Sequence, residues 1–240
     1  MLARYNGGAF FKRTADRVCD TVFASILYRA TFWGSTPKSI EFLPEPIWKG
    51  DASIGKEIIL GRFPFENSAP LVSIDPWSVE TADATQLEHL HSFHWLRDLA
   101  EADDQIAARS RVQTLIEDWI VNNEVWSPLS WRPDILGERI TLWLEYYDQL
   151  VAKGSISFRN LVIKSLSRQL KHLARVYRLR ADGPTRFTVL KGLIYGAACL
   201  PSGSKRVPSL YKALEREIDR HILHDGTYIN RNPSSHHIVL

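Results

Sequence analysis

The residues most suited to chemistry form an aromatic and basic concentration in the middle of the chain. A flat aromatic ring stacks on a sugar ring, and a guanidinium can fork onto a carboxylate with two hydrogen bonds. The combination is typical of a site for acidic sugars, so we predict that Trp131, Arg132 and Arg139 contact such a substrate. The whole concentration consists of Trp126, Trp131, Arg132, Arg139, Trp143, Tyr146 and Tyr147.

A structural alternative explains the same residues. In it, the tryptophans form a core beneath a loop, and Arg139 pairs with an acidic neighbour. Candidate partners are Glu138, Asp134 and Glu145. Both interpretations stay open on the sequence alone.

Eight histidines suggest metal binding, but their spacing does not complete a site. His89, His91 and His94 are close in sequence, and only His91 and His94 share a helical face. No second cluster of carboxylates or cysteines supplies four ligands at a recognisable spacing. We therefore predict no metal site and no cofactor, and we expect His91 to be a packed or hydrogen-bonded core residue.

The sequence also lacks a complete pair of catalytic nucleophile and general base. Ser234 and Ser235 precede His236 and His237, but adjacency neither aims a base at a hydroxyl nor orients it with a third group. The chain has no Gly-x-Ser-x-Gly elbow, no Walker-type phosphate loop and no Gly-x-Gly-x-x-Gly fingerprint. These absences argue against the common hydrolase and nucleotide-binding classes.

The charge and the apolar runs of the sequence argue against two kinds of interaction, with nucleic acid and with the interior of a membrane. The 240 residues carry 30 Lys and Arg against 27 Asp and Glu, a net charge of +3 without a long basic block, so we expect no nucleic-acid partner. The longest run without these charges, Gly192–Ser204, is far shorter than the roughly 20 apolar residues of a bilayer span, so we expect no membrane span. Met1–Asp20 has no apolar signal region, which by sequence predicts a cytoplasmic protein.

Helical periodicity dominates the chain and predicts an all-α fold. Apolar residues at i, i+3, i+4 and i+7 indicate amphipathic helices, and Phe187–Leu200, apolar nearly all round, predicts a buried inner helix. Short loops between the helices favour helical hairpins packed in sequence order. The predicted helical segments are 12–33, 83–100, 112–120, 136–150, 162–177, 187–200 and 207–222.

Proline and glycine divide the chain. Their density predicts an irregular, non-helical segment around residues 34–80, in which Ile58–Leu60 and Leu71–Ile74 are short strands or packed loop. We therefore predict an N-terminal helix plus irregular segment over 1–80, followed by a helical domain over 81–240.

Six motifs follow one another along the chain from about residue 55 to the end. They are Gly61–Phe65 (GRFPF), Asp75–Trp77 (DPW), His91–Leu99 (HSFHWLRDL), Trp126–Asp134 (WSPLSWRPD), Ser167–Leu173 (SRQLKHL), and Asp225–Gly226 with Asn230–Ser234 (NRNPS). This collinear set resembles the amino-terminal part of heparinase II/III-like proteins, especially an alphaproteobacterial branch.

The resemblance implies an α/α toroid followed by a β-sandwich, in a polysaccharide lyase that acts on uronic-acid polymers by β-elimination. One group neutralises the uronate carboxylate, a base removes the adjacent proton, and an acid, usually Tyr, serves the leaving oxygen. Asn232–Pro233 is a helix start, but the sequence ends at Leu240, before such a helix could complete two turns. We therefore expect an incomplete toroid without the β-sandwich of the same protein. The resemblance also implies work in the cell envelope or periplasm.

The resemblance suggests site residues one by one. Arg186 lies in the loop before an inner helix, where the family carries an Asn-His pair or an Arg that neutralises the carboxylate. Asn230–His236 aligns with a family stretch Glu-Arg-Ser-Pro-x-Tyr-His, with Ser235 at the Tyr position. The implied catalytic residues are Arg186, Arg231 and His236, with Tyr228 if the register shifts, and the implied substrate contact is Asn232.

A serine hydroxyl does not replace a phenol of pKa about 10 as a proton shuttle. We therefore expect little or no activity from this chain by itself. Two functions stay open: a part of a polysaccharide lyase for acidic polysaccharide, or a non-catalytic helical module that binds a glycan or a partner protein.

Overall fold

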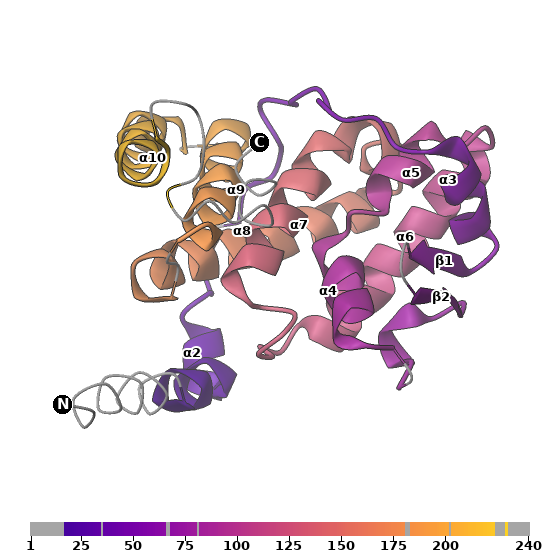
Figure 1. The fold of residues 1–240 in the computed structure, drawn as a ribbon, viewed down its shortest axis with the longest axis horizontal. Coiled ribbons are helices and arrows are strands. Elements are labelled where there is room, and N and C mark those ends of the chain that lie inside the picture. Colours follow the sequence, from indigo (N-terminus) through magenta and orange to yellow (C-terminus); the bar gives the residue numbers. More distant parts are fainter. Residues whose placement is uncertain are drawn as a thin grey trace.

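A computed structural model describes residues 17–34, 36–65, 68–80, 82–180, 183–201, 203–223 and 229. This part is mostly helical with one short two-stranded sheet, which confirms the predicted all-α class (Figure 1). The helices are α2 (Ile26–Ala30), α3 (Ala52–Ile59), α4 (Ala84–Ser92), α5 (Leu96–Glu101), α6 (Gln105–Asn123), α7 (Pro133–Glu145), α8 (Ile156–Arg180), α9 (Thr185–Cys199) and α10 (Val207–His221), after a helical stretch at 17–24. Three short turns are η1 (Pro76–Ser78), a π-helical η2 (Tyr147–Val151) and η3 (Ser204–Arg206).

Helices α7 and α9 form the centre of the molecule, with α8 packed against both and α10 against α9 (Figure 1). The two central helices touch through their backbones. A β-carbon at Gly192 would lie 2.8 Å from the carbonyl oxygen of Gly137, closer than a side-chain carbon approaches backbone. Ten residues of α9 are buried, which confirms the inner helix predicted at 187–200.

The amphipathic stripe predicted on α6 faces the core as expected. Val112, Leu115 and Ile116 are fully buried, and Trp119 is 1% exposed. The connection from α6 to α7 covers 124–132 and carries Trp126 and Trp131. Periodicity was therefore sufficient to find the helices that build the core.

The predicted helix over 83–100 is two helices. Phe93 adopts the left-handed conformation, with φ 66°, and ends α4, so α5 begins in a new direction. Because the Phe93 ring is fully buried against Trp77, Trp95, Trp119 and Trp143, packing outweighs the backbone cost of this conformation.

The segment predicted to be non-helical, 34–80, contains a helix and a hairpin. Asp51 caps α3 by accepting hydrogen bonds from the backbone N–H groups of Ser53 and Ile54, so Ile58 is helical rather than part of a strand. Strands β1 (Arg62–Phe65) and β2 (Ser68–Val72) then pair antiparallel, with Phe63 opposite Leu71.

Two further predictions need adjustment. The N-terminal helix bends at Ser25, whose hydroxyl caps α2. On α10, the buried residue is Glu217, while Tyr211 and Ile218 of the predicted apolar face stay 51% and 40% exposed. Within the described part of the chain, every helix is too short or too polar to cross a bilayer.

Candidate functional site

Four of the predicted site residues, Tyr228, Arg231, Asn232 and His236, lie outside the described residues. The others, Trp131, Arg132, Arg139 and Arg186, are described, and each has protein partners. Their surroundings decide how much of each side chain could meet a ligand.

Trp131 is a core residue beneath the N-terminal segment. It is 5% exposed, and its indole N–H donates to the carbonyl oxygen of Asn123 at 3.0 Å. Its ring stacks on Phe32 and meets the edge of His172. In this arrangement the flat face of the indole is already covered by protein.

Arg132 precedes α7 and joins two acidic residues. Its Nε and Nη2 atoms donate to the two carboxylate oxygens of Asp134 at 2.8 and 2.9 Å, and Nη1 donates to Glu88 at 2.7 Å. These partners raise the pKa of the guanidinium. The side chain is 36% exposed, which makes it more accessible than the other two described site arginines, Arg139 and Arg186.

Arg139 is fully buried and carries no acidic partner among the described residues. Its three nitrogens donate at 2.8 Å to the side-chain oxygen of Gln169 and to the carbonyl oxygens of His91 and Ser130. Burial lowers the pKa of the guanidinium well below its usual value. The predicted alternative of an ion pair with Glu138, Asp134 or Glu145 is therefore wrong, because Asp134 pairs with Arg132 instead.

Arg186 lies in the first turn of α9 and contacts α10. Its Nη1 donates to Glu217 at 2.7 Å, and its guanidinium lies over the ring of Tyr177. The Glu217 side chain is 4% exposed and also accepts from Arg220 at 3.2 Å. In this arrangement Arg186 ties two helices together.

A second set of titratable residues converges between α4–α5, α7 and α9, and the sequence did not single it out as a site. The Arg97 cluster, as we name it, consists of His89, His94, Arg97, Glu138, Glu145, Lys191 and Tyr195. Lys191 and Tyr195 are one helical turn apart on α9, so both face the same neighbours.

Arg97 interacts electrostatically with three of the six other members of the cluster. Its charge lowers the pKa of His89, His94 and Glu145. Within the described part of the chain, its side chain forms no hydrogen bond or ion pair, and its Nε is buried without an acceptor. Because buried guanidinium donors are normally paired, this one has hydrogen-bonding capacity for an acceptor from outside.

The two imidazoles are close and neutral. Burial, together with the charges of nearby cationic groups, lowers the pKa of His89 and of His94 to about 4. The ring centroids lie 5.7 Å apart, since the turn at Phe93 brings residues on either side of it together. A neutral imidazole can accept a proton or donate a hydrogen bond at neutral pH.

The other side of the cluster consists of the Glu145 carboxylate and the Tyr195 phenol. Burial raises the pKa of Glu145 and of Tyr195, and the two side chains face each other. Lys191 Nζ lies 3.6 Å from Glu138 Oε2. The cluster thus combines cations for a carboxylate with a neutral imidazole and a phenol, the residue types that β-elimination uses.

Two other features are structural. His91 accepts a hydrogen bond from the Trp119 indole at 3.0 Å, which confirms the predicted core histidine. Among the described residues, no group of three or more His, Cys, Asp or Glu side chains is placed to hold a metal ion.

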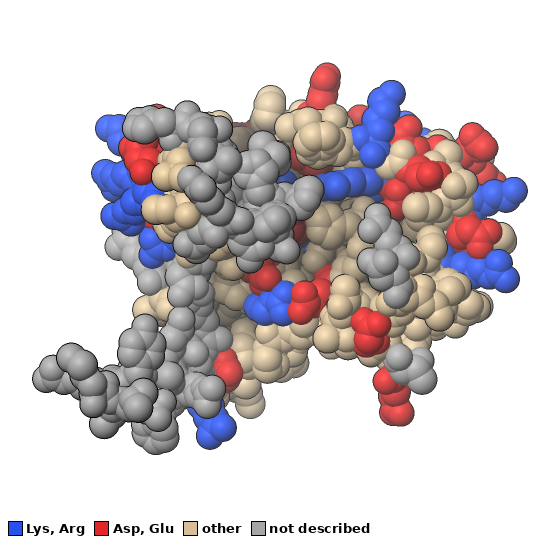
Figure 2. All heavy atoms as spheres, in the orientation of Figure 1, with Lys and Arg blue, Asp and Glu red and all other residues tan. Residues whose placement is uncertain are grey.

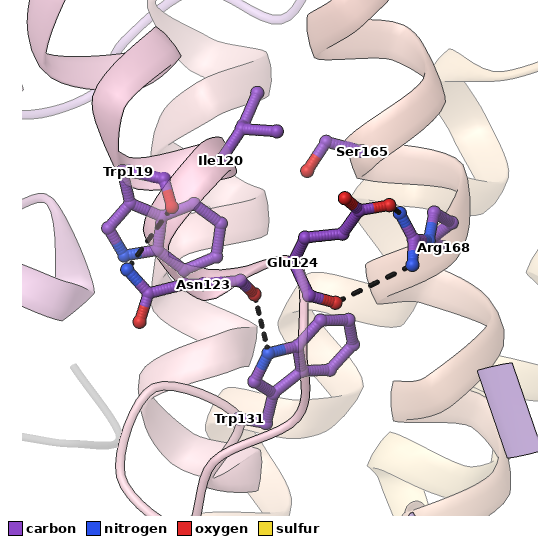
Figure 3. Close-up of a pocket in the computed structure, with 7 residues that line it drawn as sticks. All are labelled: Trp119, Ile120, Asn123, Glu124, Trp131, Ser165 and Arg168. Atoms are coloured by element: carbon purple, nitrogen blue, oxygen red, sulfur yellow. Dashed lines mark hydrogen bonds and ion pairs between the residues drawn. The ribbon is translucent and has the colours of Figure 1, made fainter. Parts of the chain in front are cut away.

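A pocket beside the aromatic concentration is too small for a sugar. Figure 3 shows Glu124 paired with Arg168 at this pocket, which Trp119 and Trp131 also line. Its free space is about 10 Å³, the room that one water molecule needs. On the face in Figure 2, acidic and basic side chains are interspersed, and basic ones gather over α10.

The fold is similar to that of solved heparan sulfate lyase and heparinase III structures. The match to the heparan sulfate lyase HepC from Pedobacter heparinus covers 94% of this chain and 39% of the HepC chain, with a TM-score of 0.56 and 16% identity. The heparinase III BT4657 gene product matches 98% of this chain and 42% of its own, with a TM-score of 0.58 and 16% identity. At this identity the likeness shows the fold alone, and the mostly helical structure is consistent with the helical region of these neighbours.

The chain is also similar in sequence to a curated protein. The chain is 27% identical over 243 residues to FtsZ-localized protein C of Caulobacter vibrioides (strain NA1000 / CB15N). The match covers 97% of this chain, which spans about two fifths, 41%, of the length of that curated relative. No family model matches the chain.

Proposed function

We propose that this protein is a heparinase-like protein whose helical part binds an acidic, uronic-acid-containing polysaccharide. The observation that carries the proposal is Arg97, a partly buried guanidinium without a protein partner among the described residues. It lies on a fold shared with heparan sulfate lyases. A uronate carboxylate would accept from Arg97 and lie within the field of Lys191.

The chemistry that follows is β-elimination by a whole protein of the relatives' length. With its carboxylate neutralised, the uronate loses the adjacent proton more easily, and neutral His94 is the group of the cluster suited to accept that proton. Tyr195, whose pKa is raised and which therefore keeps its proton, is suited to protonate the leaving oxygen. The roles of Arg186, Arg231, His236 and Tyr228 stay predictions from the resemblance.

Binding can be tested on this chain directly. We expect calorimetry to detect binding of heparan sulfate or polygalacturonate oligosaccharides to this chain. Arg97→Gln should remove most of the binding affinity. The matched control is Arg62→Gln, because Arg62 is exposed and pairs only with Glu57. If the wild-type chain binds neither polymer, or if both variants bind equally well, the proposal is wrong.

Turnover needs its own measurement. A 4,5-unsaturated product absorbs in the ultraviolet, so absorbance reports cleavage without a label. We expect little or no product from this chain by itself. Appreciable product from the chain would overturn that expectation, and loss of the product in Arg97→Gln would assign it to the Arg97 cluster.

A second function is favoured by the sequence relative. The match to FtsZ-localized protein C covers 97% of this chain, which supports a non-catalytic module that works with the division machinery. A fluorescent fusion that concentrates at the division site in Arg97→Gln as in wild type would support this function independently of polysaccharide binding. A fusion that spreads evenly through the cell would contradict it.

A further inference from the structure

The segment before α3 runs along one edge of the molecule and passes the Arg97 cluster. In Figure 1 it extends along the upper edge from α9 to α3. The backbone N–H of Glu41 donates to the carbonyl oxygen of Cys199 at 2.8 Å, at the end of α9. The carbonyl oxygen of Trp48 accepts from the Tyr146 hydroxyl at 2.7 Å, at the end of α7. The segment is therefore held at both ends.

The residues after Trp48 are fixed on α5, beside Arg97. Gly50 lies so close that a β-carbon there would overlap the backbone of Arg97, so this position needs glycine. The backbone N–H of Asp51 donates to Asp98 Oδ1 at 2.8 Å. Trp48 is thus two residues from a direct contact with the Arg97 backbone.

Tyr146 links Trp48 to the same cluster from the other side. It directly follows Glu145, a cluster member, and both Arg97 and Glu145 act on the pKa of its hydroxyl, which burial raises to about 12. The hydrogen bond from the Tyr146 hydroxyl and the contacts of Gly50 and Asp51 with α5 therefore hold the backbone at Trp48 beside the cluster.

The Trp48 side chain differs from the other tryptophans near the cluster. Trp95, Trp119 and Trp143 are at most 1% exposed, whereas Trp48 is 57% exposed. Among the described residues, the Trp48 ring has no aromatic partner and its indole N–H has no acceptor. A large aromatic side chain whose backbone is held in place and whose ring is open to solvent is suited to contact a ligand.

We propose that Trp48 is the stacking platform for a sugar ring whose carboxylate is held by Arg97. The proposal rests on the proposed function and adds a positioning residue to it. The apolar face of a pyranose covers the indole, while the guanidinium fixes the carboxylate on the ring edge. Because the two contacts differ in kind, they fix the orientation of the sugar as well as its affinity.

The test compares Trp48→Ala, Trp48→Tyr and Arg97→Gln with wild type, using heparan sulfate and polygalacturonate oligosaccharides and their carboxyl-reduced forms. Trp33→Ala is the matched control, because Trp33 is 85% exposed and lies on the N-terminal segment. Calorimetry at two salt concentrations separates stacking from charge, since only the charge contact weakens with salt. Melting temperatures establish that each variant is folded.

We expect Trp48→Ala to weaken binding about tenfold at both salt concentrations, for native and carboxyl-reduced sugar alike. Trp48→Tyr restores most of the affinity, and Trp33→Ala changes nothing. Arg97→Gln instead removes the preference for the carboxylated sugar and the salt dependence.

Three results would overturn the proposal. If Arg97→Gln weakens binding and Trp48→Ala does not, the platform is wrong and the proposed function stands. If Trp33→Ala weakens binding as much as Trp48→Ala, the effect is not specific to the cluster. If wild type binds none of the sugars, the platform and the proposed function both fail.

Discussion

The guanidinium carbon of Arg139 lies 4.1 Å from the centre of the Trp119 ring, inside a fully buried network. Its donors hold α8, through Gln169, to the end of α4, through His91, and to the loop before α7, through Ser130. One side chain thus joins three segments that are distant in sequence.

This network predicts a large stability loss on truncation. Arg139→Met fills part of the volume but leaves two carbonyl oxygens and the Gln169 amide without their donors, so we expect a loss of about 3 kcal/mol or more. Urea unfolding measures the free energy. The matched Arg62→Met change, at an exposed ion pair, should cost less than about 1 kcal/mol. Equal losses in the two variants would contradict the structural role of Arg139.

The close contact of α7 with α9 predicts that adding one methyl group at Gly192 destabilises the protein. Gly192→Ala places a β-carbon 2.8 Å from the carbonyl oxygen of Gly137, so the helices must separate, at a cost of about 1–3 kcal/mol despite the better helix propensity of Ala. Thermal melting detects the change. Ser110→Ala, at an exposed site on α6, is the control and should leave the melting temperature nearly unchanged. A stabilised Gly192→Ala protein would show that these helices are not in backbone contact.

The buried imidazoles predict acid sensitivity. Since burial lowers the pKa of His89, His91 and His94 to about 4, the unfolded chain takes up protons below pH about 6.5 that the folded chain does not. Stability is therefore present at neutral pH and is lost as the pH falls toward 4, by about 2 kcal/mol for each imidazole between pH 7 and pH 5.

His94→Gln tests this directly. The variant lacks one imidazole, so its unfolding free energy should fall less than that of wild type between pH 7 and pH 5. Denaturant titrations at the two pH values measure the difference. The same fall in both proteins would mean that His94 is not held neutral by burial.

The buried ion pairs of Glu217 predict that this residue attaches α10 to the rest of the protein. Its carboxylate accepts from Arg186 and Arg220 while being almost fully buried, so Glu217→Ala should cost about 1–3 kcal/mol and speed hydrogen exchange in α10. Glu215→Ala on the same helix is the control, because Glu215 is exposed, and it should change neither quantity. Unchanged exchange in Glu217→Ala would show that apolar packing alone holds the helix.

Much of the fold follows from the sequence. The spacing of Val112, Leu115 and Trp119 predicts which side of α6 is buried, because a helix repeats every 3.6 residues whatever surrounds it. The uniform apolar character of 187–200 likewise predicts an inner helix. The order of the motifs predicts a heparinase-like fold, with which the helical region of heparan sulfate lyases agrees.

The site depends on what tertiary structure brings together. Phe93 takes a left-handed conformation because four tryptophans enclose its ring, and no local pattern near His91 predicts that turn. The cluster that results joins Arg97 to residues of α7 and α9 that are 40 to 100 positions away along the chain. Local sequence determines helices through backbone periodicity, whereas burial, partners and pKa values depend on long-range packing, which the tertiary structure alone decides.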